Sequence, residues 1–361
     1  MTALPRNIID ADGHIAETSE MIKQIAGYMP PEYANAADFL KSLGLFPPLD
    51  QWHIPTFLTR PNAFHPVGPE GWLEFADAGG IAHTALYPTL GLSYGWVTNV
   101  DYAAGLCKAY NNWLHEHWLK KSSRFIGVGL IPMQDTAEAI KELRRIVGLG
   151  FKGAFLPSTG LKTHLGDQIY WPIYEEADRL GCMFALHGGA HSGLGLDRLN
   201  DFAGLHALGH PFGVTVNFVG IIVNTIFERF PNVRWGFLES GIGWFLMALE
   251  RLDGSTSNFM PFNPGNRVFD RARTDESVTD YVRRHTEAGR VYVGVEGEEP
   301  GLSLAIKLVG NRGLMFSSDF PHENSPEHIA QELQELLERK DLTSEDKQRI
   351  LRDNAAALYK V

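Results

Sequence analysis

Carboxylate and imidazole side chains follow several short apolar runs of the sequence, at the point where each run ends. Asp12 and His14 come after the first run, His187 ends the fifth, and Asp319 ends the eighth. Because alternate residues of a strand point to the same side, Asp12 and His14 offer two ligands from one strand end. The four residues form a set of two imidazoles and two carboxylates. Such nitrogen and oxygen donors suit Zn²⁺, Mn²⁺ or Fe²⁺ better than a soft metal or Ca²⁺.

The elements that must position these residues are eight short, nearly continuous apolar runs, as expected for strands covered on both faces. We predict strands at residues 7–12, 83–88, 125–132, 153–157, 183–187, 233–239, 291–296 and 314–319. Helical patterns cover residues 102–120, 136–149, 171–180, 213–229, 244–253, 302–309, 326–337 and 344–358. This alternation predicts an α/β fold, a (β/α)8 TIM-like barrel with its chemistry at the carboxyl ends of the strands. A doubly wound sheet is the competing fold.

Two stretches interrupt the alternation. Residues 18–82 separate the first two predicted strands and contain two Pro-Pro pairs, with one helix expected near residues 72–78. Residues 254–276 come after the sixth strand and are rich in Asn, Pro and Gly. We interpret both as insertions in a single domain that spans residues 1–361, and we expect them to cover the active-site face.

The chain resembles the amidohydrolase superfamily, specifically the amidohydrolase-related branch that includes metal-dependent decarboxylases. The resemblance covers nearly the whole chain and is carried by Asp12-Gly-His14, His187-Gly-Gly and Ser317-Ser-Asp-Phe-Pro-His322. The last motif is the most specific, since it is close to the family's Ser-Asp-Tyr/Phe-Pro-His pattern. The resemblance implies a TIM-like barrel with one or two divalent metal ions, and it matches His14, His187 and Asp319 to metal ligands. It also implies that Asp319 is the general base for a metal-bound water.

The sequence departs from the family pattern at three places. Asp12 stands where many members have the first histidine of a His-x-His pair, which makes the site harder and more anionic. Glu239 stands where many members have a histidine after strand six; it could bind a metal, act as an acid or base, or hold a neighbouring histidine. The predicted strand at 153–157 has no internal lysine, and Lys152 precedes it. We therefore do not expect a lysine-bridged binuclear site.

Four further residues are candidates for the site. His210, in a Gly-His-Pro sequence, precedes a predicted helix, where it could act in catalysis from the helix N-terminus or make helix-entry hydrogen bonds. His191 follows two glycines and an alanine and could line the site. For His322 we favour a role in orienting its loop over direct catalysis, although it could bind the metal. Glu17 is either an additional carboxylate ligand or an exposed loop residue.

The composition narrows the expected partners. The 361 residues are 44% hydrophobic and 21% charged, and 32 Lys and Arg against 43 Asp and Glu give a net charge of −11. This acidic balance disfavours nucleic acid and anionic membrane surfaces as partners. No hydrophobic signal core is seen near the start, and the two cysteines form no CxxC motif, which fits a reducing cytoplasm. We expect a cytoplasmic enzyme for a small-molecule substrate, a homo-oligomer or a partner of a homologous subunit.

Three functions fit these residues. The first is metal-dependent hydrolysis or decarboxylation of a small carboxylated or carbonyl-bearing molecule. The second is a non-haem dinuclear iron or iron–manganese oxygenase that hydroxylates a small molecule, which the carboxylate-rich ligand set allows. The third is a catalytically silent homologous subunit. The identity of the metal and its number per chain would separate the first two functions.

Overall fold

The computed structural model describes residues 7–34, 44–49, 66–259, 276–322 and 324–361. Eight parallel strands form one sheet in chain order. They are β1 (Ile8–Ile15), β2 (Ile81–Pro88), β3 (Phe125–Leu130), β4 (Gly153–Pro157), β5 (Met183–His187), β6 (Arg234–Phe237), β7 (Val291–Val295) and β8 (Leu314–Phe316). The segment after β8 returns to β1, where Asp319 N donates to Asp12 O at 2.9 Å and His14 N to Phe320 O at 2.8 Å. The predicted (β/α)8 barrel is confirmed.

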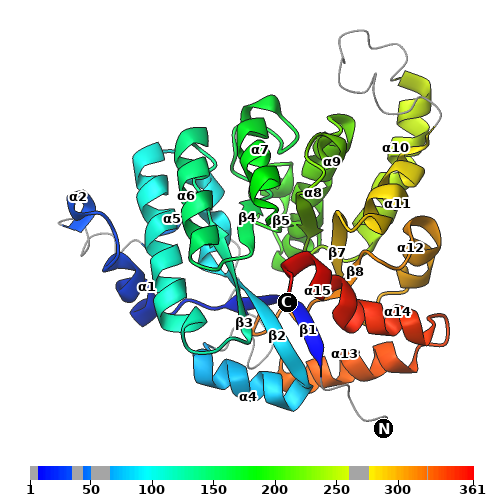
Figure 1. Cartoon of the computed structure of the whole chain (residues 1–361), viewed down its shortest axis with the longest axis horizontal. Coiled ribbons are helices and arrows are strands. Elements are labelled where there is room, and N and C mark those ends of the chain that lie inside the picture. The colour runs from blue at the N-terminus through cyan, green and yellow to red at the C-terminus, as the bar shows by residue number, and fades with distance from the viewer. Residues whose placement is uncertain (1–6, 35–43, 50–65, 260–275, 323) are drawn as a thin grey trace.

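Helices surround the strands as an outer layer (Figure 1). They are α1 (Ser19–Ala26), α2 (Pro31–Ala34), α4 (Pro69–Gly79), α5 (Val100–Leu114), α6 (Thr136–Gly148), α7 (Trp171–Leu180), α8 (Phe202–Val223), α9 (Ile226–Arg229), α10 (Gly243–Phe259), α11 (Val278–Glu287), α12 (Leu302–Val309), α13 (Pro326–Glu338), α14 (Ser344–Gln348) and α15 (Asn354–Tyr359). A π-helical turn at His115–Leu119 extends α5, and another at Arg349–Asp353 joins α14 to α15.

Most strand residues are apolar on both faces, which is why they form buried strands, and β1 is the main exception because it carries Asp10, Asp12 and His14. All eight residues of β1 are buried, as are all those of β3 to β8. The helices instead bury one face: α6 is capped by Asp135, whose side chain accepts from Glu138 N, and it buries Leu143 and Ile146 against the barrel. Barrel strands of this kind need no polar residue for stability, so buried polar groups at their ends point to another role.

The helix predicted at residues 213–229 begins too late and is in fact two helices, of which the second ends at residue 229 as predicted. The first, α8, begins with the Asp201 cap, whose side chain accepts from Gly204 N at 3.1 Å, and it runs through Pro211. Proline is common in the first turn of a helix, which made residue 211 look like a start. At the other end Thr225, with φ of 50°, separates α8 from α9. His210 therefore lies inside a helix and not at a helix N-terminus.

The two interruptions are only partly described. The helix expected near residues 72–78 is α4, and residues 254–259 continue α10 instead of opening a loop. Within residues 44–49, Pro47 O accepts from Ser93 Oγ at 2.6 Å and Leu49 O accepts from His191 N at 2.9 Å. These contacts bring residues 44–49 to the loops that follow β2 and β5, at the active-site face. Residues 35–43, 50–65 and 260–275 lie outside the described residues, so the covering role of the insertions stays a prediction.

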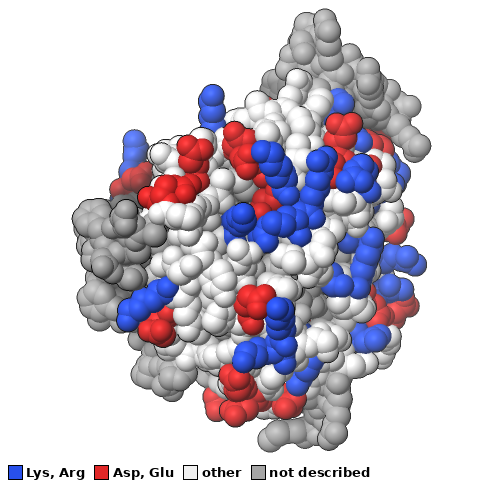
Figure 2. All heavy atoms as spheres, turned by 60° about the vertical axis from the view of Figure 1, so that its left-hand side comes forward, with Lys and Arg blue, Asp and Glu red and all other residues white. Residues whose placement is uncertain are grey.

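Acidic and basic side chains are interspersed over the face of the molecule in Figure 2. Among the described helices, α8 alone is long and apolar enough to cross a membrane by length and composition. Half of its apolar window is buried inside the protein, and it carries the buried residues His210 and Asn217. Core helices pass the same test, so α8 is weak evidence for a membrane span.

Candidate metal centre

Two histidines at the centre of the barrel are oriented by main-chain oxygens. His14 Nδ1, in β1, lies 2.9 Å from Pro88 O, and His187 Nδ1, at the end of β5, lies 2.8 Å from Gly188 O. Each ring presents Nε2 to the centre, where the two Nε2 atoms are 3.1 Å apart. A hydrogen bond from Nδ1 to a carbonyl fixes the tautomer whose Nε2 can bind a metal. Both side chains are fully buried.

Asp12 brings a carboxylate to the same point. Its Oδ1 is 3.5 Å from His14 Nε2 and 3.3 Å from His187 Nε2. The side chain is fully buried, and neither oxygen has a hydrogen-bond partner among the described residues. Burying a carboxylate without donors is costly, and a bound cation removes that cost. The donor set of Asp12, His14 and His187 therefore fits a divalent metal.

A second group of ligand atoms overlaps the first. Asp12, His14 and His187 form one group; His14, Glu239, Asp319 and His322 form another; within each, the ligand atoms lie within 4.8 Å of one another. Asp319 Oδ1 is 3.4 Å from His14 Nε2 and 2.8 Å from His322 Nδ1. The structure thus brings together all five residues that the sequence analysis named as metal ligands. The second group also contains His322, which the sequence analysis gave as a possible ligand and which stacks on the ring of His14 at 4.0 Å.

Glu239 lies between three histidines. Its Oε2 is 3.2 Å from His187 Nδ1 and 3.5 Å from His210 Nδ1, and its Oε1 is 3.7 Å from His322 Nδ1. Glu239 and Asp319 have φ of 48° and 51°, a left-handed conformation that only five non-glycine residues in the described part of the chain adopt. Such strain persists where the surroundings impose it and is common at functional sites.

Without a metal, the pKa values of two candidate ligands, Asp12 and His187, are raised, so both groups tend to hold protons. Burial raises the pKa of Asp12 to about 7, against the opposing charge of His187. For His187 burial acts in the opposite direction, but the Asp12 and Glu239 carboxylates outweigh it and raise the pKa to about 9. A metal ion would replace these protons, so metal binding and proton release should be coupled.

Asp10, which the sequence analysis passed over, fixes the strand that carries Asp12 and His14. Its carboxylate accepts from Ser318 N at 2.9 Å, Ser318 Oγ at 2.8 Å and Thr84 Oγ1 at 2.8 Å. These bonds tie β1 to β2 and to the loop after β8 directly behind the metal centre. The signal in the sequence was its place two residues before Asp12, which puts both on alternate positions of one strand.

We predict that Asp10→Ala destabilises the protein by about 3 kcal/mol, because it leaves several buried donors without an acceptor. Chemical denaturation would measure the free energy of unfolding. Asp101→Ala, at an exposed position in the first turn of α5, is the matched control and should change it by less than about 0.5 kcal/mol. A loss below about 1 kcal/mol for Asp10→Ala would contradict the role given to this residue.

Glu17 has neither of the positions expected for it. The residue is 9% exposed, and its carboxylate accepts from Thr89 N at 3.1 Å, Leu90 N at 2.8 Å and Gly91 N at 3.4 Å. It belongs to neither ligand group. The backbone N–H groups that open the 3-10 helix Leu90–Trp96 hold this carboxylate, so Glu17 orders the loop after β2.

His191 and His210 line the approach to the centre as a pair. Their Nε2 atoms are 2.9 Å apart, and His210 Nδ1 faces Glu239. Two glycines make room for the rings: a Cβ on Gly188 would lie 1.8 Å from His210 Nδ1, and one on Gly209 would lie 2.1 Å from the ring of His191. His191 is 6% and His210 8% exposed. Both lie beside the candidate ligands, outside the two ligand groups.

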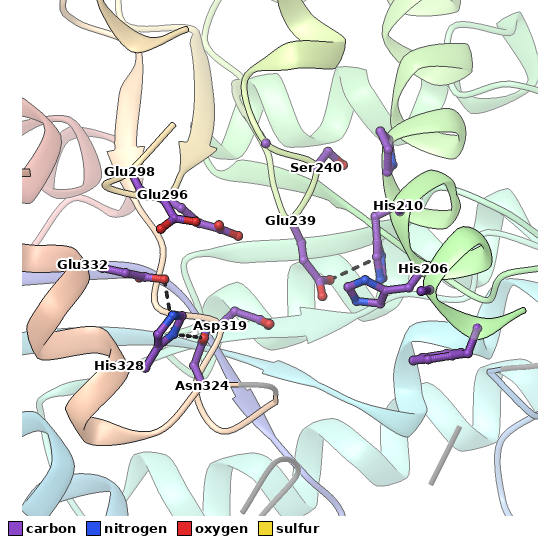
Figure 3. A pocket seen from close by; sticks show the side chains of 15 residues that line it. His206, His210, Glu239, Ser240, Glu296, Glu298, Asp319, Asn324, His328 and Glu332 are labelled. Carbon is purple, nitrogen blue, oxygen red and sulfur yellow. Dashed lines mark hydrogen bonds and ion pairs between the residues drawn. The ribbon is translucent and has the colours of Figure 1, made fainter. Parts of the chain in front are cut away.

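A cavity of about 610 Å³ opens above the metal centre, a volume typical of small-molecule sites. Figure 3 shows Glu239 and Asp319 between its two sides. The cavity is lined by Phe202, Ala203, His206, Ala207, His210, Pro211, Glu239, Ser240, Gly241, Glu296, Glu298, Asp319, Asn324, His328 and Glu332. The sequence analysis did not name the residues from α13 or His206 as candidates, because helical periodicity does not say which part of α13 or α8 reaches over the strand ends.

A barrel with histidine and carboxylate ligands at its strand ends defines a metal-dependent hydrolase-like class of protein. The family model for amidohydrolase matches residues 9–361, and the chain belongs to that family. The resemblance inferred from the motifs is thereby confirmed.

Curated relatives of the chain are decarboxylases. It is 26% identical over 256 residues to 2-amino-3-carboxymuconate-6-semialdehyde decarboxylase from Dictyostelium discoideum, a match covering 69% of this chain and 67% of that protein. It is 27% identical over 284 residues to gamma-resorcylate decarboxylase from Rhodococcus jostii, covering 72% and 78%.

Solved structures of similar fold include dihydroxybenzoic acid decarboxylase from Polaromonas sp. with bound manganese and 2-nitroresorcinol. That structure has a TM-score of 0.69 at 20% identity and covers 98% of this chain and 97% of its own. The structure of 5-carboxyvanillate decarboxylase from Sphingomonas paucimobilis has a TM-score of 0.72 at 18% identity and covers 99% of this chain and 100% of its own.

Proposed function

We propose that this protein is a metal-dependent decarboxylase that removes CO₂ from a small carboxylic acid. The observation that carries the proposal is the buried carboxylate of Asp12, without a hydrogen-bond partner among the described residues, beside two imidazole Nε2 atoms. One of those imidazoles, His14, also faces Asp319, which lines the cavity. β4 carries no lysine, and Lys152 Nζ lies 3.4 Å from Lys360 O at the opposite end of the barrel, so a lysine-bridged hydrolase centre is not supported. The two curated relatives described above are decarboxylases, and they favour loss of CO₂ over hydrolysis.

The residues divide the work as follows. Asp12, His14 and His187 would hold a divalent metal, Asp319 would stand beside it as a further ligand or as the proton carrier, and Glu239 would hold the metal or fix the surrounding histidines. When bound, a divalent metal would supply positive charge that attracts the substrate carboxylate and stabilises the negative charge that develops on loss of CO₂. The relative with bound manganese makes Mn²⁺ the first metal to test.

Decarboxylation leaves an electron pair on the carbon that carried the carboxylate, and a proton must take the place of CO₂. Asp319 lines the cavity, and its Oδ1 is 2.8 Å from His322 Nδ1. Burial raises the pKa of Asp319, while the Asp319 charge outweighs burial and raises the pKa of His322 well above its usual range. This pair holds a proton beside the cavity, and we assign Asp319 to deliver it to the carbon.

The test is CO₂ release from a panel of hydroxylated aromatic and unsaturated carboxylic acids, with protein loaded with Mn²⁺, Zn²⁺ or Fe²⁺. We expect at least one acid to lose one CO₂ per molecule, and we expect removal of the metal by a chelator to stop the reaction. Adding the metal back should restore it. Hydrolysis of ester or amide members of the panel without any CO₂ release would overturn the assignment.

A second candidate function rests on the two overlapping ligand groups that share His14. Because His14 Nε2 can bind only one ion, a second ion would rest on Glu239, Asp319 and His322. Carboxylate-rich centres with histidines can hold iron that activates oxygen. Metal analysis of protein purified without chelator decides between the candidates. One metal per chain and no oxygen uptake would exclude a dinuclear oxygenase, whereas two iron ions per chain with substrate-dependent oxygen uptake would replace the decarboxylase proposal.

A further inference from the structure

The cavity above the metal centre has two chemically different sides (Figure 3). On the α8 side, Phe202, Ala207 and Pro211 give an apolar surface beside the histidines. The opposite side carries three carboxylates: Glu296 and Glu298 from the loop after β7, and Glu332 from α13. We call these three residues the acidic wall.

No lysine or arginine lines the cavity in the described part of the chain, so the acidic wall has no cationic side chain to balance it. Arg339, just beyond α13, is engaged elsewhere: its Nη1 donates to Gly297 O at 3.4 Å and its Nη2 to Asp341 Oδ2 at 2.7 Å. His328 reaches the wall, with Nδ1 at 3.5 Å from Glu332 Oε1 and 2.6 Å from Asn324 Oδ1.

Glu332 is the buried member of the acidic wall. It is 2% exposed, it lines the cavity, and its Oε2 has no hydrogen-bond partner among the described residues. A buried carboxylate oxygen without a partner, in a residue that lines a cavity, is the kind of group that a ligand satisfies. Burial, followed by the charges of Glu296, Glu298 and Asp319, raises the pKa of Glu332 to about 8. The charge of Asp319, in the candidate metal centre, therefore acts on Glu332 in the acidic wall.

A metal ion is not the ligand that the acidic wall fits. Its three carboxylates are absent from the groups of converging ligand atoms found among the described residues. Carboxylates that line one cavity side without converging suit an ammonium group, which donates up to three separate hydrogen bonds. A second carboxylate on the substrate would meet like charges instead.

We propose that the acidic wall selects a substrate with a protonated amine at the end opposite the carboxylate that it loses. This inference rests on the proposed function for the position of that carboxylate, which the metal centre binds. The apolar body of the substrate lies along Phe202, Ala207 and Pro211, and its ammonium group donates to Glu298 and Glu332. The substrate class is therefore that of small amino-bearing carboxylic acids, and dicarboxylic acids of the same size are excluded.

The experiment compares three probes on manganese-loaded protein by calorimetry: 4-(aminomethyl)benzoate, 4-(hydroxymethyl)benzoate and terephthalate. They differ only at the end that meets the wall. We expect the amine to bind about tenfold more tightly than the alcohol, and terephthalate to bind more weakly than either, since a hydrogen bond to a charged group contributes more than a neutral one. Equal or tighter binding of terephthalate would overturn the proposal.

Variants assign the preference to the wall. The Glu298→Gln/Glu332→Gln double variant should bring the amine-to-alcohol ratio close to one, while Glu338→Gln, on an exposed position of the same helix, should leave it unchanged. Glu298→Gln alone, at an exposed position, should reduce the ratio even if the buried substitution impairs folding. An undiminished ratio in both Glu298→Gln and a folded double variant would contradict the proposal.

Benzylamine and benzyl alcohol separate this inference from the proposed function, because neither carries a carboxylate for the metal. Benzylamine should bind better than benzyl alcohol, and the double variant should lose the difference, whether or not any acid releases CO₂. If the benzoates do not bind but benzylamine binds better than benzyl alcohol, the role of the acidic wall is supported. Binding of the substrate carboxylate at the metal centre is then contradicted. If the protein binds benzylamine no better than benzyl alcohol, and 4-(aminomethyl)benzoate no better than 4-(hydroxymethyl)benzoate, the proposal for the acidic wall is wrong.

Discussion

Replacing Asp319 with asparagine should lower the rate of CO₂ release by about a thousandfold, the scale expected for loss of a positioned proton donor. Asparagine keeps the size of the side chain but cannot hold the transferable proton that the mechanism assigns to Oδ1. It also accepts the left-handed backbone conformation at residue 319 more readily than most residues do, so the loop should keep its shape. The measurement is the turnover number for the acid identified in the panel, with thermal unfolding as the test of folding.

Asp280→Asn makes the same chemical change on the exposed side of α11 and is the matched control, with an expected effect on turnover within about twofold. Metal content distinguishes two ways in which Asp319→Asn could act. Full metal content with little turnover supports proton delivery by Asp319. Proportional losses of metal and turnover would show that the residue acts as a ligand alone. Retention of more than a tenth of the turnover would make the assignment of Asp319 wrong.

The central site was predictable because its residues follow a local rule. Asp12 and His14 alternate on one strand, and His187 and Asp319 end or follow other strands, so the barrel topology alone brings them together. The position of His210 was not predictable in the same way. Pro211 lies inside α8, although a proline often marks the first turn of a helix. Only the structure of the whole helix shows that Asp201 is its N-cap.

The acidic wall shows what local patterns leave out, whereas the helix α11 did carry a local pattern. Acidic residues on an amphipathic helix are usually solvent-exposed. Glu332 is buried because α13 lies against the loop after β7. α11 had a local signal that was missed: Ser277 caps it by accepting from Asp280 N, and Val278, Tyr281 and Val282 are buried on one face. Contacts between distant elements decide such burial, and periodicity within one element does not contain that information.

His187→Ala should lower the metal content per chain to less than about half of that of the unaltered protein. The ring supplies an Nε2 donor to the centre, and its loss also leaves the Asp12 carboxylate without its nearest positive partner. Since Asp12 and His187 bind protons before metal arrives, with pKa values of about 7 and 9, metal affinity in the unaltered protein should fall as pH drops from 8 to 6. In the variant this dependence should weaken, because one of the two competing protons is gone.

Elemental analysis after dialysis measures the stoichiometry, and titration with Mn²⁺ at several pH values measures the affinity. His285→Ala is a control matched in burial: His285 is fully buried against Tyr281 and Phe227 and lies outside both ligand groups. It should lower the thermal unfolding temperature without lowering metal content. A His187→Ala protein that kept its metal would remove this residue from the ligand set, whereas metal loss in both variants would trace the effect to weakened folding. Metal loss confined to His187→Ala is the result that the geometry of the two Nε2 atoms requires.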